Sequence, residues 1–126
     1  MLKINGFIYA ETPFLQAVHE AAFDFTRFTE SGHRYAFKAF ECLESGYLKG
    51  AGTSLIWSLD FFFTGLFRTR WAGRIVRLLF FWLQIFDLLI PPQYNIDAAN
   101  GVFFWGRKTG EIFKKKDIVR YYKGGQ

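Results

Sequence analysis

The sequence predicts an α/β fold in which a small three-stranded sheet is interrupted by two apolar helices. Three observations support this prediction. With 126 residues, the chain has the length of one compact domain. Short runs typical of strands, at 6–10, 40–48 and 98–108, are separated by stretches with helical periodicity. A composition of 51% hydrophobic and 21% charged residues excludes an intrinsically disordered chain.

The first half of the chain predicts two strands and a helix. Residues 6–10 are expected to form a buried strand that closes at Pro13, which cannot donate to a ladder. Residues 14–28 mix rings and charged side chains without a sustained period, which is typical of a functional loop or a short helix. Thr29 is expected to be the N-cap of a helix of about three turns. Residues 40–48 alternate apolar and polar side chains and form the second predicted strand.

Two apolar stretches, 53–67 and 71–90, follow. A bilayer-spanning helix needs about 20 mostly apolar residues, whereas the first stretch is shorter and has Asp60 at its middle, and the second contains Asp87. We therefore predict two amphipathic helices whose apolar faces pack on the sheet or form a lid over a lipophilic acceptor. The alternative is that these faces contact a membrane while basic residues meet anionic headgroups. The basic residues concerned are Arg68, Arg70, Arg74 and Arg77.

The end of the chain predicts one more strand and a tail. Pro91 and Pro92 end the second helix, because proline cannot continue the intrahelical ladder, and a loop through Asn95 and Asp97 is expected. Residues 98–108 form the third predicted strand. We divide the chain into residues 1–108, with the insertion 53–90, and a basic tail, 109–126, expected to be solvated and mobile.

Cysteine usage and charge limit the compartment and the partners. The single Cys42, expected to be a small buried hydrophobe, excludes an internal disulfide, and no export signal is visible. We therefore expect a cytoplasmic chain, peripheral to the membrane if the helices contact one. The formal net charge of +5 is too scattered to predict nucleic-acid binding, and no nucleic acid is expected. His33 is expected at the surface.

Two stretches resemble the second half of class I S-adenosylmethionine-dependent methyltransferases. Within that class, the resemblance is to the small-molecule enzymes that are similar to methyltransferase type 11. In that family a turn leads into the fifth strand, and its motif is a leucine, a basic residue, any residue and then two glycines. The run Leu2-Lys3-Ile4-Asn5-Gly6 resembles this turn. This resemblance continues to residue 29. Residues 95–108 resemble the family's final strand, which commonly ends in Gly, Arg or Lys. Together with the second predicted strand, the resemblance covers residues 2–50 and 93–108.

The resemblance implies a partial Rossmann-like methyltransferase sheet. Its strands would be the family's fifth, seventh and sixth, side by side in that order, with the seventh antiparallel to the others. The family binds its cofactor through a glycine-rich turn and an acidic residue after its first two strands, and this sequence has neither motif. S-adenosylmethionine is thus implied for the complete family domain, and no cofactor is expected for this chain alone. A complementary N-terminal half or a second copy is the expected partner, because the fifth strand would keep an unpaired edge.

The resemblance also places an acceptor pocket in the loop after the first strand. There, His19 would be the catalytic residue that deprotonates a hydroxyl or amine during methyl transfer. Phe14, Gln16, Asp24 and Arg27 would bind the substrate. The structural alternative is that His19 caps a turn and that Asp24 pairs with Arg27 to hold the loop. No metal site is expected, because no short ligand spacing is present.

Two functions from different classes remain open. The chain is either a methyltransferase-like domain that contributes the acceptor side and is inactive alone, or a non-catalytic module for contact with a membrane surface or another protein. The missing cofactor motifs, together with the broad apolar helix faces, keep the second function in consideration.

Overall fold

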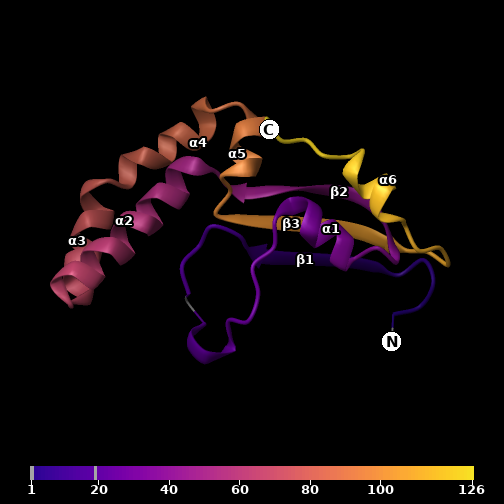
Figure 1. The fold of residues 1–126 in the computed structure, drawn as a ribbon, viewed down its shortest axis with the longest axis horizontal. Helices are drawn as coiled ribbons and strands as arrows, with labels where there is room; N and C mark the ends of the chain where they lie inside the picture. The colour runs from indigo at the N-terminus through magenta and orange to yellow at the C-terminus, as the bar shows by residue number, and fades with distance from the viewer. Residues whose placement is uncertain (1, 19) are drawn as a thin grey trace.

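The computed structural model describes residues 2–18 and 20–126. Three strands, β1 (Phe7–Pro13), β2 (Phe40–Lys49) and β3 (Gly101–Lys108), form one sheet. β3 lies between the other two strands and is antiparallel to both, so that the order is β1-β3-β2 (Figure 1). The predicted α/β class and the three-stranded sheet are confirmed. The strand order is also the one that the resemblance implies.

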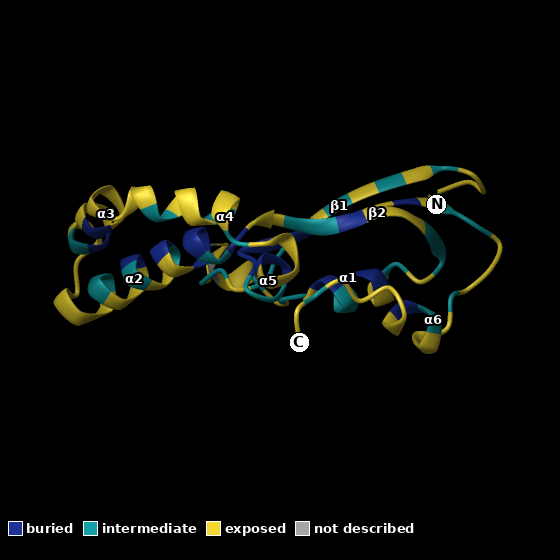
Figure 2. Cartoon of the chain, turned by 90° about the horizontal axis from the view of Figure 1, so that it is seen from above, coloured by how far each residue is buried: buried dark blue, intermediate teal, exposed yellow. Residues whose placement is uncertain are grey.

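The two faces of the sheet differ in what covers them. Ala10, Phe104 and Ser45 are register partners on neighbouring strands and therefore lie on the same face. The helices α1 (Glu30–Ala36) and α6 (Lys115–Val119) lie on one side of the sheet, as Figure 2 shows, and α1 packs on β3 and β2. The neighbouring register pair, Tyr9 and Trp105, points to the opposite face of the sheet, and these residues are 58% and 41% exposed. At these rings the second face of the sheet is open to solvent.

The core is centred on Phe104, which is almost completely buried. The Phe37 ring stacks on it at a centroid distance of 5.0 Å, and the His33 ring lies edge-on at 6.2 Å. The expectation of a surface His33 is wrong, because this position of α1 is turned toward β3 and Phe28 covers the ring from the other side. Burial lowers the pKa of His33, since the charged imidazolium would lose its water. Cys42, expected to be buried, is exposed beside the bulge in the edge strand β2.

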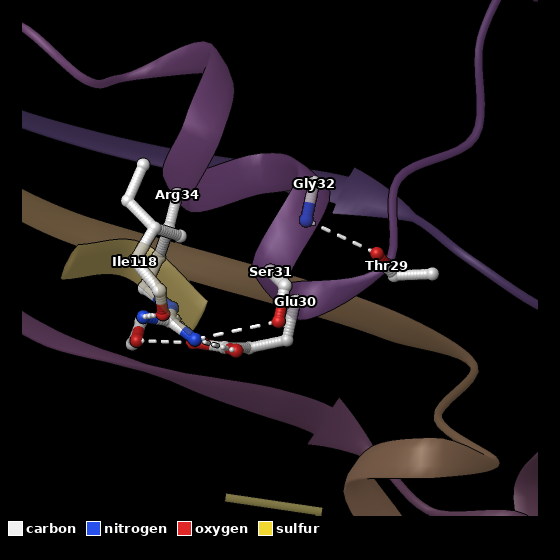
Figure 3. A network of polar contacts seen from close by, with 7 residues as sticks. Thr29, Glu30, Ser31, Gly32, Arg34 and Ile118 are labelled. Atoms are coloured by element: carbon white, nitrogen blue, oxygen red, sulfur yellow. Dashed lines mark hydrogen bonds and ion pairs between the residues drawn. The ribbon is translucent and has the colours of Figure 1, made fainter. Parts of the chain in front are cut away.

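A buried ion pair fixes α1 against the rest of the domain (Figure 3). Thr29 is the N-cap, as predicted, and its Oγ1 accepts a hydrogen bond from the backbone N–H of Gly32 at 3.0 Å. Glu30 and Arg34, each with 4% of its surface exposed, pair through Arg34 Nη2 and Glu30 Oε2 at 2.9 Å. The hydroxyl of Ser45, on β2, donates to the same carboxylate. The helix has only seven residues, about one turn less than expected.

The carboxyl-terminal tail is mostly exposed, as predicted, but it is anchored to this pair through α6. Arg34 Nη1 donates to the carbonyl of Ile118 in α6 at 2.8 Å, and the Ile118 side chain is buried. Further along the tail, the Tyr122 hydroxyl donates to Asp97 Oδ1 at 2.5 Å. The N–H groups of Phe113 and Gly125 also donate to the Lys38 carbonyl and to Asp97 Oδ2, each at 2.8 Å, so several polar contacts and the buried Ile118 hold a segment whose composition is that of a free tail.

The two apolar stretches form an arm that projects away from the sheet (Figures 1 and 2). The arm, residues 51–89, consists of α2 (Ala51–Phe67), α3 (Arg70–Leu79), a 3-10 turn (Phe81–Ile85) and α4 (Phe86–Leu89). Arg68 turns the chain between α2 and α3 with a left-handed φ of 54°. The predicted packing of both apolar faces on the sheet is wrong, because α2 and α3 pack mainly on each other.

A short helix, α5 (Pro92–Asp97), joins the arm to β3 where a loop was expected. Proline ends the preceding helix, but at the first position of a new helix it costs nothing, since its fixed φ suits that position and its missing N–H would be unpaired there. One 3-10 turn, Ala21–Phe23, lies within the loop between β1 and α1.

Candidate functional site

The loop predicted to form an acceptor pocket is closed by its own side chains. Arg27 Nη2 donates to Asp24 Oδ2 at 2.6 Å, and Arg27 Nε donates to the carbonyl of Gln16 at 2.9 Å. These contacts correspond to the structural alternative for Asp24 and Arg27. A substrate-binding role for either residue stays a prediction.

The remaining predicted pocket residues do not gather at one cavity. Phe14 lines a cavity of about 180 Å³ with Ile96 and Tyr122, whereas Gln16 lines another, of about 230 Å³, with Leu48. His19 lies outside the described residues, and its catalytic role also stays a prediction. Among residues 2–18 and 20–126, no group of three His, Cys, Asp or Glu side chains is placed to hold a metal ion.

The arm has a closely packed polar seam between its helices. Gly73 of α3 faces Asp60 of α2 so closely that a Cβ at position 73 would lie 2.7 Å from the Asp60 carbonyl oxygen. The Asp60 carboxylate accepts a hydrogen bond from Thr64 Oγ1 at 3.3 Å and lies 3.4 Å from Arg77 Nε. Glycine at this position allows the helices to approach, so that Asp60 of α2 pairs with Arg77 of α3 across the seam while Thr64 donates to Asp60 from the next turn of α2.

The base of the arm is held by two polar side chains, the half-buried Asp87 and the buried Asn95. Asp87 of α4 accepts hydrogen bonds from the backbone N–H of Thr53 at 3.1 Å and from the Thr53 hydroxyl, at the start of α2. Asn95, which is completely buried, accepts from the N–H of Ala51 at 3.0 Å and donates to the carbonyls of Asp87 and Ile90 at 2.8 and 3.0 Å. The arm therefore leaves the sheet in a defined direction.

The outer surface of the arm is apolar. Large apolar side chains recur at spacings of three, four or seven residues, which places them on one stripe of α2 and one stripe of α3. These residues are between 48% and 72% exposed, and they are Leu55, Phe62, Leu66, Trp71, Ile75 and Leu78. The return segment adds Ile85, Leu88 and Leu89, all more than half exposed. Each stripe lies opposite the seam on its own helix, so the two stripes point to different sides of the arm. Exposed large apolar side chains in this number are unusual on a soluble monomer and mark an interaction site.

Three arginines border the apolar stripe of α3. Arg70, Arg74 and Arg77 each directly precede one of its apolar residues, so the basic stripe lies about 100° around the helix from the apolar stripe. The guanidinium of Arg74 lies 5.0 Å from the centre of the Trp71 ring, and that of Arg77 lies 5.8 Å from Trp57. With Asp60, Thr64, Phe61 and Val18, the three arginines and Trp57 line a cavity of about 310 Å³.

The sequence correctly indicated which side of α2 is polar and which is apolar. The expected contact of the apolar side with the sheet is wrong, because α2 packs mainly on α3. Thr53, Asp60 and Thr64 share one side of the helix, and that side faces the partner segment instead of solvent. Two glycines could have indicated this, because each stands where another segment approaches closely: Gly52 faces the Leu83 carbonyl of the return segment, and Gly73 faces Asp60. No helix within residues 2–18 and 20–126 combines the length and apolarity needed to cross a bilayer.

Comparison of the chain with models of protein families, with curated proteins and with solved structures finds no match. The methyltransferase resemblance therefore gains no support from relatives, and a function must be argued from the geometry described above.

Proposed function

We propose that this chain is a non-catalytic module that attaches to an anionic membrane surface through the helical arm. The observation that carries this proposal is the inverted arrangement of the arm, whose polar side chains meet in the seam while its large apolar side chains face outward. A helix pair built for water would have the opposite arrangement.

The apolar area supports binding by shallow insertion. Fully burying a large apolar side chain is worth about 1.5–3 kcal/mol, so burying the exposed half of the three α3 stripe residues, Trp71, Ile75 and Leu78, would contribute about 2–5 kcal/mol. Helices that lie in the membrane interface bury their apolar side about 5–10 Å deep, at the boundary of headgroups and acyl chains. This depth places the bordering arginines among the headgroups, where each basic residue contributes about 1 kcal/mol on anionic lipid.

The test is flotation with vesicles of phosphatidylcholine alone and of phosphatidylcholine with phosphatidylserine. Replacing Trp71, Ile75 and Leu78 by serine removes the apolar stripe of α3 that the arginines border, and is expected to lower partitioning about a hundredfold. The matched control replaces Phe7, Tyr9 and Trp105, which are comparably exposed on the open face of the sheet, and is expected to float like the original chain.

Two results would contradict the proposal: flotation of the arm variant, or loss of flotation in the sheet variant. Added salt should weaken binding to the anionic vesicles, since the headgroup attraction is screened. A stable, vesicle-indifferent dimer in sedimentation would instead assign the apolar stripes to a second copy of the chain.

A second candidate function is the acceptor side of a methyltransferase, completed by a partner that carries the cofactor site. The strand order β1-β3-β2 with an antiparallel central strand favours it. Under this proposal the free edge of β1 would pair with the complementary half. Titration calorimetry with S-adenosylmethionine is expected to show no binding to this chain alone at sub-millimolar cofactor, and clear binding would contradict the assignment of the cofactor site to another chain.

A further inference from the structure

The cavity on the arginine-bearing side of the arm has the charge of a receptor for a dianion. Arg70, Arg74 and Arg77 contribute three positive charges to its lining, and Asp60 contributes one negative charge, which leaves a net charge of about +2. Asp60 is engaged by Arg77 and Thr64 in the seam, so its carboxylate is partly neutralised before any ligand arrives.

We propose that this cavity binds a phosphomonoester group. A phosphomonoester carries a charge of about −1.5 to −2 near neutral pH and offers three acceptor oxygens, which matches the cavity's charge and its guanidinium donors. A diester phosphate carries only a single negative charge. Arginine is also the residue that suits this ligand best, because its planar fork can donate two parallel hydrogen bonds to the oxygens of one phosphate.

The walls of the cavity limit what else it can hold. Its volume of about 310 Å³ is at the lower end for ligand sites, which suits a headgroup or a small phosphate ester. Trp57 and Phe61 form an apolar side to the cavity, and Val18 contributes from the loop between β1 and α1. The Arg74 and Arg77 guanidiniums are already placed by their contacts with Trp71 and Trp57, which reduces the side-chain freedom lost when a phosphate binds.

Two kinds of molecule carry such a phosphate group: a membrane lipid and a free phosphate ester. If the arm lies in the membrane interface as proposed above, its arginine-bearing side is at headgroup depth and a lipid phosphomonoester, such as phosphatidic acid, is the ligand. If the arm is not in a membrane, a free phosphomonoester is the ligand. The lipid source rests on the proposed function, whereas the cavity's recognition of phosphate does not.

Neighbouring arginines provide a matched pair of variants for the test. Arg70 lines the cavity and Arg68, two residues earlier in the same turn, does not. Arg70→Gln and Arg68→Gln thus lose the same charge near the same end of the arm. Arg70→Lys keeps the charge and loses the two-pronged donor.

One experiment compares vesicles containing phosphatidic acid with vesicles whose surface charge is matched with phosphatidylglycerol. We expect the original chain and Arg68→Gln to prefer phosphatidic acid about tenfold or more, and Arg70→Gln and Arg70→Lys to lose that preference. A second experiment titrates glycerol 3-phosphate into the chain without vesicles and follows binding by calorimetry, with inorganic sulfate as the comparison ion.

The outcomes separate this inference from the proposed function. A phosphatidic acid preference that depends on Arg70 supports the lipid source, and glycerol 3-phosphate binding that depends on Arg70 supports the free source. Equal flotation on both vesicle types without glycerol 3-phosphate binding overturns the inference while the membrane proposal stands. Failure to float on either vesicle type contradicts the membrane proposal. In that case the glycerol 3-phosphate titration alone tests whether the cavity binds a phosphomonoester, and absence of binding overturns the inference.

Discussion

Replacing Gly73 by alanine tests whether the arm is organised around a polar seam. An added Cβ would lie 2.7 Å from the Asp60 carbonyl oxygen and would also collide with the Asp60 and Thr64 side chains. Insertion of one carbon into a packed contact typically costs about 1–3 kcal/mol, and loss of the Thr64–Asp60 hydrogen bond adds about 1 kcal/mol. Alanine's higher helix propensity opposes this by about 1 kcal/mol.

Gly65→Ala is the matched control, because Gly65 lies in the neighbouring helix of the arm with no atom within 4 Å of its added Cβ. It receives the same propensity gain of about 1 kcal/mol without the collision. The two variants should therefore differ by about 2–4 kcal/mol in the free energy that opens the arm.

Hydrogen exchange of the arm amides measures this opening free energy directly, and the β3 amides around Phe104 serve as an internal reference. We expect the arm amides to be less protected in Gly73→Ala than in Gly65→Ala, with the β3 amides unchanged. Equal protection in the two variants would refute the close approach of α2 and α3 on which the polar seam depends.

Three further predictions concern buried polar groups. Asn95→Ala leaves the N–H of Ala51 and two carbonyls without partners and should cost at least about 3 kcal/mol in urea unfolding, whereas a loss under about 1 kcal/mol would contradict the hydrogen bonds given to it. A double-mutant cycle of Thr53→Val and Asp87→Ala should give a coupling of about 1–2 kcal/mol, and additive effects would show that the pair is not formed. Burial lowers the pKa of folded His33 despite the opposing attraction of Glu30, so the unfolded chain binds more protons as the pH falls below 6.5 and stability should decline there. His33→Phe should remove up to about 1.4 kcal/mol of that decline per pH unit, and an unchanged pH profile of unfolding would be the contrary result.

The strands and the N-cap could be predicted from the sequence because their signals are local. Alternation of side chains over 40–48, the ring-rich run at 102–105 and Thr29 before a helical segment require no knowledge of the rest of the chain. The order of the strands could not be derived from such signals, and it was expected only through the family resemblance.

The arm and the tail could not be predicted because their positions depend on tertiary contacts. An amphipathic pattern shows that a helix has two sides, but it does not show which neighbour each side meets. In the arm, the close approach at Gly73 turned the polar side inward. In the tail, the burial of Ile118 and its carbonyl contact with Arg34 anchor a segment that is otherwise mostly exposed, as its composition predicts.

The candidate site could be predicted only in part. The arginines and the apolar positions of the arm were recognised, whereas the cavity that joins Arg70, Arg74 and Arg77 to Trp57 forms only when α2 and α3 are packed together. For the predicted acceptor loop, the spacing of Asp24 and Arg27 was sufficient to anticipate their ion pair.

The most direct test of membrane attachment through the arm is the depth of Trp71 in a bilayer. Two variants, each with three of the four tryptophans replaced by phenylalanine, would keep either Trp71, on the outer stripe of the arm, or Trp105, on the open face of the sheet. On anionic vesicles that contain brominated acyl chains, the account predicts strong quenching and a blue shift of Trp71 and little change in Trp105. Quenching of Trp105 with an unaffected Trp71 would contradict it.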